Sequence, residues 1–351
     1  MKKDIRSFTL PELRDEIKNA GLPRFRAEQI YRWLHVAHVE SFDEMTDLPK
    51  SLRQELSDNF VIFGCAIEMK LVSEYDSTVK YLFSLYDGEV IETVLMKYKY
   101  GYTVCVSSQV GCRMGCKFCA STLNGVVRNL MPSEILGQVY AVENDNNIQV
   151  SHIVMMGMGE PLDNYDNVLR FLSLITDENG RNLSMRHISL STCGVVPKIY
   201  DLMEKNLQLT LSVSLHAPND AIRSSMMPVN KAYSIDKLLE ACRKYTKATS
   251  RRISFEYALV RGVNDTPECA AELAKRLKNM LCHVNLIPVN EVKETECKES
   301  YAETVKKFAE MLSSKGLNVT VRRKLGADIN AACGQLRRSH AAKNTVTGET
   351  N

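Results

Sequence analysis

Three cysteines close together are the residues of this sequence whose types and spacing point most directly to chemistry. Cys112, Cys116 and Cys119 have the spacing Cys-x-x-x-Cys-x-x-Cys. Cysteine thiolates hold iron–sulfur clusters, and three thiolates from one loop can bind three irons of a four-iron cube, which leaves the fourth iron open to a substrate. Gly111 and Gly115 would let the backbone wrap closely around such a group. The alternative is a structural zinc site, which usually needs four ligands in paired units, and no second pair lies nearby.

A second set of candidate residues follows predicted strands. The segment Met156–Pro161 contains Gly159, which allows a close backbone approach, and Glu160, which can accept hydrogen bonds from the ammonium group of a bound amino acid. Barrel enzymes place their sites at the carboxyl ends of parallel strands, so we expect these residues to share one site. Further polar or flanking residues at predicted strand ends are Ser191, Ser214, Leu215, His216 and Asn290. For His216 alone, a structural histidine with satisfied hydrogen bonds is an equally good interpretation.

The elements that position these residues can be predicted from the sequence. After Tyr100, predicted strands and predicted helices alternate along the chain. This alternation predicts an α/β fold with a parallel sheet, closed partly or completely into a (β/α) barrel of about six units. The predicted strands are Tyr102–Ser107, His152–Met156, His187–Ser191, Gln208–Ser214, Arg252–Ala258, Val284–Val289 and Asn318–Arg322. The predicted helices between them include Ser133–Val142, Asn167–Leu174, Ile235–Tyr245 and Cys269–Leu281.

The remaining chain divides into three further parts. Residues 1–62 are predicted to form a small all-helical accessory domain, which begins at a capping box formed by Thr9 and Glu12. Residues 63–100 are predicted to form a β extension, in which a hairpin turns at Asp87-Gly88. The barrel core with a C-terminal catalytic loop is expected over 101–336, and the small polar residues of 337–351 predict a disordered tail.

Composition narrows the class of protein. The chain has 351 residues and a net charge of +3, which is too small to identify a nucleic-acid-binding protein by charge alone. Local basic clusters occur at Arg251-Arg252, Arg322-Arg323-Lys324 and Arg337-Arg338. There is no leader-like N-terminus and no apolar run of membrane-spanning length, so we expect a cytoplasmic protein. Its 11 cysteines are an odd number, which in a reducing compartment favours metal binding or reactivity over a disulfide framework.

The cysteine spacing resembles that of the radical SAM superfamily, whose members cleave S-adenosylmethionine (SAM). The surrounding residues resemble more specifically the RlmN-type adenine C2-methyltransferases, which are related to the Cfr-type C8-methyltransferases. Cys105 and the run Ala331–Leu336 carry this narrower resemblance. It implies a [4Fe-4S] cluster on Cys112, Cys116 and Cys119. It also implies that SAM contacts Gly159, Glu160, Ser191, Ser214, Leu215, His216 and Asn290.

The resemblance also implies a covalent mechanism. Cys333 would accept a methyl group from a first SAM, and a radical made from a second SAM would activate that group to attack the adenine carbon. Glu92 would accept the ring proton, and Cys105 would displace the Cys333 sulfur through a transient disulfide. Cys105 lies seven residues before Cys112, and we place both on the same strand, where Cys105 can face the barrel interior.

The expected substrates and partners follow from the same resemblance. They are 23S ribosomal RNA near the peptidyl-transferase centre, the tRNA adenine 3′ of the anticodon, and an electron donor such as flavodoxin or ferredoxin. We expect a monomer that does not bind membranes. Three alternatives remain: C8 methylation of rRNA, an iron–sulfur RNA-binding protein without turnover, and a radical SAM enzyme acting on a small molecule or peptide. Mere binding would need neither Cys105 nor Cys333.

Overall fold

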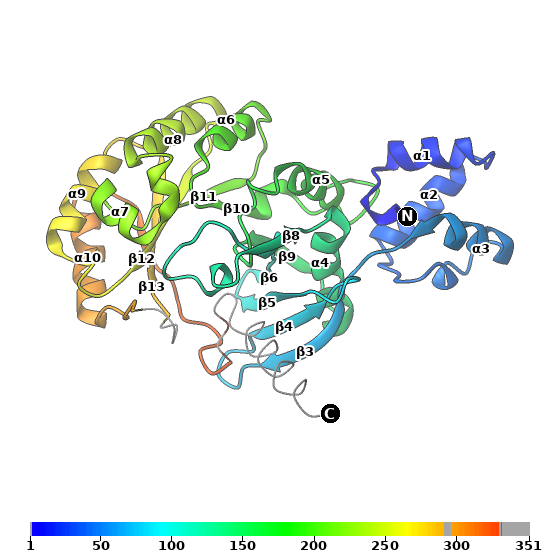
Figure 1. Ribbon diagram of the computed structural model, residues 1–351, viewed down its shortest axis with the longest axis horizontal. Helices are drawn as coiled ribbons and strands as arrows, with labels where there is room; N and C mark the ends of the chain where they lie inside the picture. Colours follow the sequence, from blue (N-terminus) through cyan, green and yellow to red (C-terminus); the bar gives the residue numbers. More distant parts are fainter. Residues whose placement is uncertain (1, 291–295, 330, 332–351) are drawn as a thin grey trace.

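The computed structural model describes residues 2–290, 296–329 and 331. Its centre is a 10-stranded sheet with the order β14-β13-β12-β11-β10-β9-β6-β5-β4-β3. Among the described residues β3 and β14 are the two edges, so the sheet is an open, partial barrel (Figure 1). Its parallel strands are β6 (Gly101–Cys105), β9 (Val150–Met155), β10 (Ile188–Thr192), β11 (Thr210–Ser214), β12 (Ile253–Leu259), β13 (Cys282–Pro288) and β14 (Val319–Val321).

The expected strand–helix alternation is confirmed. Each predicted parallel strand is present to within a few residues, and helices connect most of them. The helices are α4 (Pro132–Asn146), α5 (Tyr165–Ile175), α6 (Val196–Glu204), α7 (Asp220–Met226), α8 (Ile235–Thr249), α9 (Pro267–Leu277) and α10 (Ala302–Ser314). The helix predicted over Cys269–Leu281 starts earlier, at Pro267, and ends earlier, at Leu277. Thr266 is its N-cap residue, because the Thr266 side chain accepts a hydrogen bond from the Cys269 N–H.

Before the barrel, three antiparallel strands continue the same sheet. They are β3 (Ala66–Val72), β4 (Val79–Ser84) and β5 (Val90–Tyr98), and β5 pairs with β6. The predicted hairpin is therefore part of the main sheet, with its turn at Asp87-Gly88, where Gly88 has a φ of 81° that favours glycine.

The N-terminal residues form a separate group of helices (Figure 1). These are α1 (Leu10–Asn19), α2 (Phe25–His35) and α3 (Lys50–Asn59). The Thr9 capping box is present, because the Thr9 N–H donates to Glu12 and the Glu12 N–H donates to Thr9 Oγ1. In addition to the expected helices, a short parallel pair joins β1 (Lys3–Asp4) to β2 (Phe60–Val61). The group contacts the barrel where His38 stacks on Tyr140 of α4, with the ring centroids 3.8 Å apart.

The strand register gives the sheet two chemically different faces. Side chains of paired residues lie on the same face, and successive residues alternate. The face covered by helices carries apolar residues that are fully buried, among them Ile153, Leu190, Leu211, Val213, Phe255 and Val284. The opposite face, here called the inner face, carries Cys105, Ser189, Ser191, Ser212, Ser214, Glu256, Asn285 and Thr320. A polar inner face in an otherwise apolar fold is the place where a polar ligand can bind.

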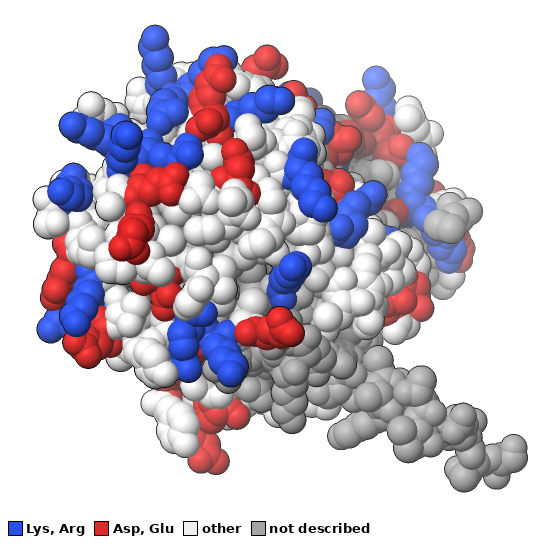
Figure 2. Space-filling view, turned by 60° about the vertical axis from the view of Figure 1, so that its left-hand side comes forward, with Lys and Arg blue, Asp and Glu red and all other residues white. Residues whose placement is uncertain are grey.

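Charged side chains are mixed over the surface. Figure 2 shows Lys and Arg interspersed with Asp and Glu on the face it presents, without one dominant basic patch. Of the expected basic clusters, Arg251 and Arg322 are partly buried, and Arg252 and Arg323 are exposed. Arg337-Arg338 and the predicted tail lie outside the described residues.

Candidate active site

The three clustered cysteines lie in a loop that a small hairpin closes. Strand β7 (Gln109–Gly111) precedes the loop and pairs with β8 (Val126–Asn129) after it. Gly111 and Gly115 have φ values of 77° and 71°, as the expected wrapping requires. The expectation that Cys105 and Cys112 share a strand is wrong, because β6 ends at Cys105 and the chain turns before β7.

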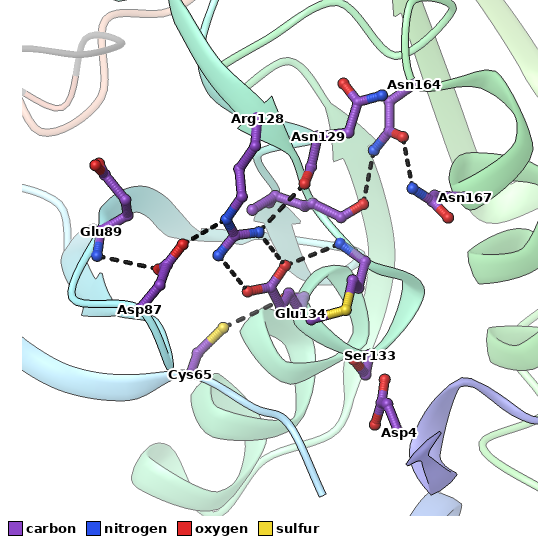
Figure 3. Close-up of polar contacts among 12 residues, drawn as sticks. Asp4, Cys65, Asp87, Glu89, Arg128, Asn129, Ser133, Glu134, Asn164 and Asn167 are labelled. Carbon is purple, nitrogen blue, oxygen red and sulfur yellow. Dashed lines mark hydrogen bonds and ion pairs between the residues drawn. The ribbon is translucent and has the colours of Figure 1, made fainter. Parts of the chain in front are cut away.

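An ion-pair network anchors the base of this hairpin (Figure 3). Arg128 of β8 donates through two nitrogens to the buried Glu134 of α4, at 2.8 Å each, and through Nε to Asp87 at 2.6 Å. Asn164 Nδ2 donates to the carbonyls of Ser108 and Leu130, at 2.8 Å each. The hairpin is thus fixed to the β4–β5 turn, to α4 and to the start of α5.

The thiols of the loop are suited to a metal cluster. Burial raises the pKa of Cys112 to about 11, and burial together with the neighbouring thiolates raises the pKa of Cys116 further. Such thiols become thiolates only beside strong positive charge, which bound iron supplies. Within the described ranges, no three His, Cys, Asp or Glu side chains are arranged to hold a single ion. A cube-shaped cluster does not need such convergence, since each thiolate binds a different iron.

The cysteine loop rests against the end of β11. The Phe118 ring meets the His216 ring edge-on, with centroids 4.8 Å apart, and the Lys117 N–H donates to the Met226 carbonyl at 2.9 Å. A Cβ at Gly115 would come within 3.3 Å of Pro228. The structure therefore brings His216, which we expected near SAM from its position after a strand, next to the loop that would hold the cluster.

His216 is held in an unusual conformation. Its φ of 55° is in the left-handed region, and its Nδ1 accepts the Ala258 N–H at 2.8 Å. Burial lowers the pKa of His216 to about 3, so the ring is neutral. Leu215 is fully buried, and its N–H donates to the Glu256 carbonyl. Both residues thus fix the chain at the end of β11.

Glu160 lies in the loop that follows β9. Gly157 and Gly159 precede it. A Cβ at Gly157 would lie 2.7 Å from Val106, and a Cβ at Gly159 would lie 2.6 Å from Gln109, so a larger residue fits at neither position. The Glu160 carboxylate is buried and accepts the N–H groups of Cys193, at 2.7 Å, and Leu162, at 3.0 Å. Burial raises its pKa. The side chains of Thr192 and Cys193 also hydrogen-bond to this carboxylate, which can accept a ligand ammonium where such a ligand replaces one of these donors.

The other expected SAM residues lie at the same end of the barrel. Ser191 and Ser214 are on the inner face, on neighbouring strands. Asn290 is exposed and follows the end of β13. Cys193, for which we expected no role, is buried beside Glu160 and packs in one apolar cluster with Cys116.

A buried arginine that sequence analysis missed joins these strand ends. Arg223 of α7 is fully buried, and its guanidinium donates to the carbonyls of Cys193 at 2.6 Å, Ser214 at 3.1 Å and Leu215 at 3.1 Å. It also donates to Asn230 Oδ1 at 3.1 Å. An arginine on a short helix gives no sequence signal of burial, since such residues are mostly exposed.

The proposed proton acceptor and resolving cysteine share the inner face. Cys105 pairs with Val94, and Glu92 lies two residues from Val94 on the same face of β5. Both residues are buried. Lys80 of β4 lies on this face too, with its Nζ 3.3 Å from Glu92 Oε1. Burial raises the pKa of Cys119, and the charge of Glu92 adds to this rise, so the acid lies near the cysteine loop.

Cys333 lies outside the described residues, but the chain leading to it is anchored. Asp328 accepts from Ser73 Oγ at 2.7 Å and from the Glu74 N–H at 2.9 Å. The Gly326 N–H donates to Asp76 at 2.8 Å. These contacts fix the segment against the β3–β4 turn, directly before the strand that carries Lys80.

Comparison with known proteins agrees with this geometry. Residues 106–277 match the Radical SAM superfamily, and residues 3–62 match the Ribosomal RNA large subunit methyltransferase N-terminal domain. The chain is 52% identical to a probable dual-specificity RNA methyltransferase RlmN of Clostridium novyi, over 97% of this chain and 100% of that protein. It is 53% identical to the protein so named in Desulforamulus reducens, over 98% of each chain.

A solved structure extends the similarity to three dimensions. The crystal structure of a radical SAM methyltransferase from Sphaerobacter thermophilus superimposes with a TM-score of 0.92 at 42% identity, covering 95% of this chain and 98% of that one. In the described part of the chain, no helix has both the length and the apolar character needed to cross a membrane. Identity at this level over nearly the whole chain places the protein in the RlmN family of radical SAM methyltransferases.

Proposed function

We propose that this protein methylates C2 of a specific adenine in 23S rRNA, near the peptidyl-transferase centre, and in tRNA, 3′ of the anticodon. The RlmN relatives are named dual-specificity RNA methyltransferases, which supports an RNA substrate. The observation that carries the proposal is the placement of Cys105 and Glu92 on one buried face, beside the cysteine loop.

In this proposal Cys112, Cys116 and Cys119 hold a [4Fe-4S] cluster, and the fourth iron is left for SAM. Gly159, Glu160, Ser191, Ser214, Leu215, His216 and Asn290 form the SAM site around it. When bound, the cluster and SAM supply the methyl group and the one-electron chemistry that an unreactive ring carbon requires. Arg223 and Glu160 hold the strand ends that shape this site.

The protein's own residues then divide the reaction between them. Cys333 carries the methyl group and bonds covalently to the adenine. Glu92 accepts the ring proton, and its buried carboxylate lies 3.3 Å from Lys80 Nζ. Cys105 attacks the Cys333 sulfur, so that a disulfide forms while the carbon–sulfur bond breaks and the methylated base leaves. The anchored segment before Cys333 supports this role, because it ends near the strand that carries Lys80.

We further propose the following division of the chain. Residues 1–62 help to hold RNA, 63–100 extend the sheet beside the active site, and 101–336 form the radical SAM core with its catalytic loop. The protein works in the cytoplasm as a monomer and receives electrons from a flavodoxin or ferredoxin. An iron–sulfur RNA-binding protein without turnover would have no use for a buried acid and thiol at this position.

Mass spectrometry of nucleosides tests this function. We expect 2-methyladenosine to disappear from rRNA and tRNA of a strain lacking the gene and to return with the wild-type gene. Cys105→Ala and Cys333→Ala should fail to restore it. Cys269→Ala is the matched control, and this variant should restore the modification. The Cys269 thiol is also buried, but it belongs to α9, on the side of the sheet that the helices cover. Return of 8-methyladenosine instead would establish the C8 alternative and overturn the C2 assignment.

A further inference from the structure

Four aromatic rings form a continuous ladder at the end of the sheet opposite the cysteine loop. The ladder consists of Tyr98, Tyr100, His152 and His187. Tyr98 stacks on Tyr100 with centroids 5.0 Å apart, Tyr100 meets His152 at 4.9 Å, and His152 stacks on His187 at 4.5 Å. The rings come from the β5–β6 turn, from β9 and from the residue before β10. The proposed chemistry uses none of them.

Two rings of the ladder, Tyr100 and His187, are open to solvent. Tyr100 is 61% exposed and His187 is also exposed, whereas Tyr98 and His152 are half-buried. Burial lowers the pKa of His152, so its ring is uncharged at neutral pH. A group of rings that packed only for stability would bury all of its members, because each aromatic side chain gains from leaving water. Exposed rings in a row offer flat surfaces on which nucleobases stack.

The ladder and the catalytic residues share the inner face. Tyr98 lies six residues after Glu92 on β5, and His152 pairs with Thr103, two residues before Cys105. Even spacing along a strand keeps side chains on one face. Strand β6 spans about 13 Å from Gly101 to Cys105. A single-stranded segment can therefore place one base at the cysteine and a base further along the same strand on the ladder.

Positive charge lies beside the rings. Burial raises the pKa of Tyr98, and the charges of Arg322 and Arg323 act against this rise, so both charges act on this ring. The register also puts Arg322 on the inner face, two residues after Thr320, which pairs with Asn285. Lys324, the third member of this basic cluster, pairs instead with Glu299. Guanidinium groups next to a stacking surface suit the phosphates of a nucleotide chain.

We propose that the aromatic ladder, together with Arg322 and Arg323, binds a single-stranded segment that flanks the methylated adenine. One base stacks on Tyr100 and another on His187, because the His152 ring between them is inclined by 71° to the Tyr100 ring, and the arginines contact the phosphates of this segment. This site rests on the proposed function, because it takes RNA as the substrate. It adds a second point of attachment that orients the RNA while the target base occupies the catalytic end.

The test is RNA binding by the holoprotein under anaerobic conditions without reductant, measured by fluorescence anisotropy. The probe is a labelled RNA hairpin with an adenine-containing single-stranded loop. Removing one stacking ring in Tyr100→Ala or His187→Ala should raise Kd roughly 5- to 150-fold. Tyr100→Phe should bind like the wild type. Tyr301→Ala is the control, since that tyrosine is 63% exposed but lies at the start of α10.

The arginines have a separate signature. Arg322→Gln and Arg323→Gln should each lower the slope of log Kd against log salt by about 0.7 for every phosphate that the protein no longer neutralises. A fully paired duplex should bind equally well to the wild type and to Tyr100→Ala. Unchanged Kd values in both alanine variants, or a Kd for Tyr100→Phe as weak as for Tyr100→Ala, would overturn the stacking site.

A separate readout keeps this site distinct from the proposed function. SAM cleavage and methylation of Cys333 without RNA should be the same in the ladder variants as in the wild type. If the wild-type protein bound RNA through the ladder but made no methyladenosine, the proposed reaction would fail and the binding site would stand. If methylation persisted with ladder-independent Kd values, the binding site alone would fail.

Discussion

Replacing Lys80 with methionine should destabilise the folded protein strongly. Lys80 and Glu92 form an ion pair at 3.3 Å, and their side chains are only 1% and 4% exposed. Removing the ammonium takes away a positive charge that lies 3.3 Å from the buried Glu92 carboxylate, and breaking a buried ion pair in this way costs about 3–5 kcal/mol of unfolding free energy. Lys70→Met is the control on the neighbouring strand. Its ion pair with Asp145 is 34% and 24% exposed, so we expect a cost of about 0–1 kcal/mol.

The double variant Lys80→Met/Glu92→Leu decides whether the charge pairing causes this cost. Replacing both partners with apolar residues of similar size should restore stability to within about 1–2 kcal/mol of the wild type. Urea unfolding of the holoprotein, followed by far-ultraviolet circular dichroism at pH 7, measures the wild type, Lys70→Met, Lys80→Met, Glu92→Leu and the double variant. A loss below about 1 kcal/mol in Lys80→Met, or single costs that simply add in the double variant, would refute the reasoning.

Three further predictions concern the cluster, the methyl acceptor and pH. Wild-type protein purified without oxygen should bind about four irons, and Cys112→Ala should lose both the iron and SAM cleavage; stoichiometric zinc and no visible absorbance would contradict this. Cys333→Ala should keep the iron and cleave SAM but transfer no methyl to RNA, and wild-type peptides should carry S-methylcysteine at Cys333. Burial lowers the pKa of His35 to about 3, so only the unfolded state takes up its proton between about pH 6.5 and 3. Unfolding free energy should therefore fall as pH falls through that range, by up to about 1.4 kcal/mol per unit, and His35→Gln should remove this contribution; an equal slope in the variant would refute it.

Local signals in the sequence predicted much of the fold. The Thr9 capping box, the turn at Asp87-Gly88 and the alternation after Tyr100 all depend on neighbours in the chain, and each was confirmed. The strands β7 and β8 were not predicted, because each has only three or four residues and no periodic pattern. Strand β7 lies between β6 and the cysteine loop, which is why Cys105 and Cys112 do not share a strand.

Long-range contacts in the site could not be predicted from the sequence. Lys80 has the pattern of a solvent-facing residue of a hairpin, and only the register of β4 against β5 brings it to Glu92. Arg223 is buried because three strand-end carbonyls surround it, and those carbonyls belong to other elements. The cysteine spacing, by contrast, is a local signal. The loop that holds those cysteines could therefore be recognised before its surroundings were known.

The fate of RNA in Cys105→Ala tests the central claim most directly. If Cys105 resolves the covalent intermediate, the variant should still methylate Cys333 and bond it to the adenine, but no thiol would displace the sulfur. RNA should then stay attached to the protein through one extra carbon on denaturing gels, and the adduct should vanish in Cys105→Ala/Cys333→Ala. Free 2-methyladenosine at normal yield from Cys105→Ala, with no adduct, would contradict the account.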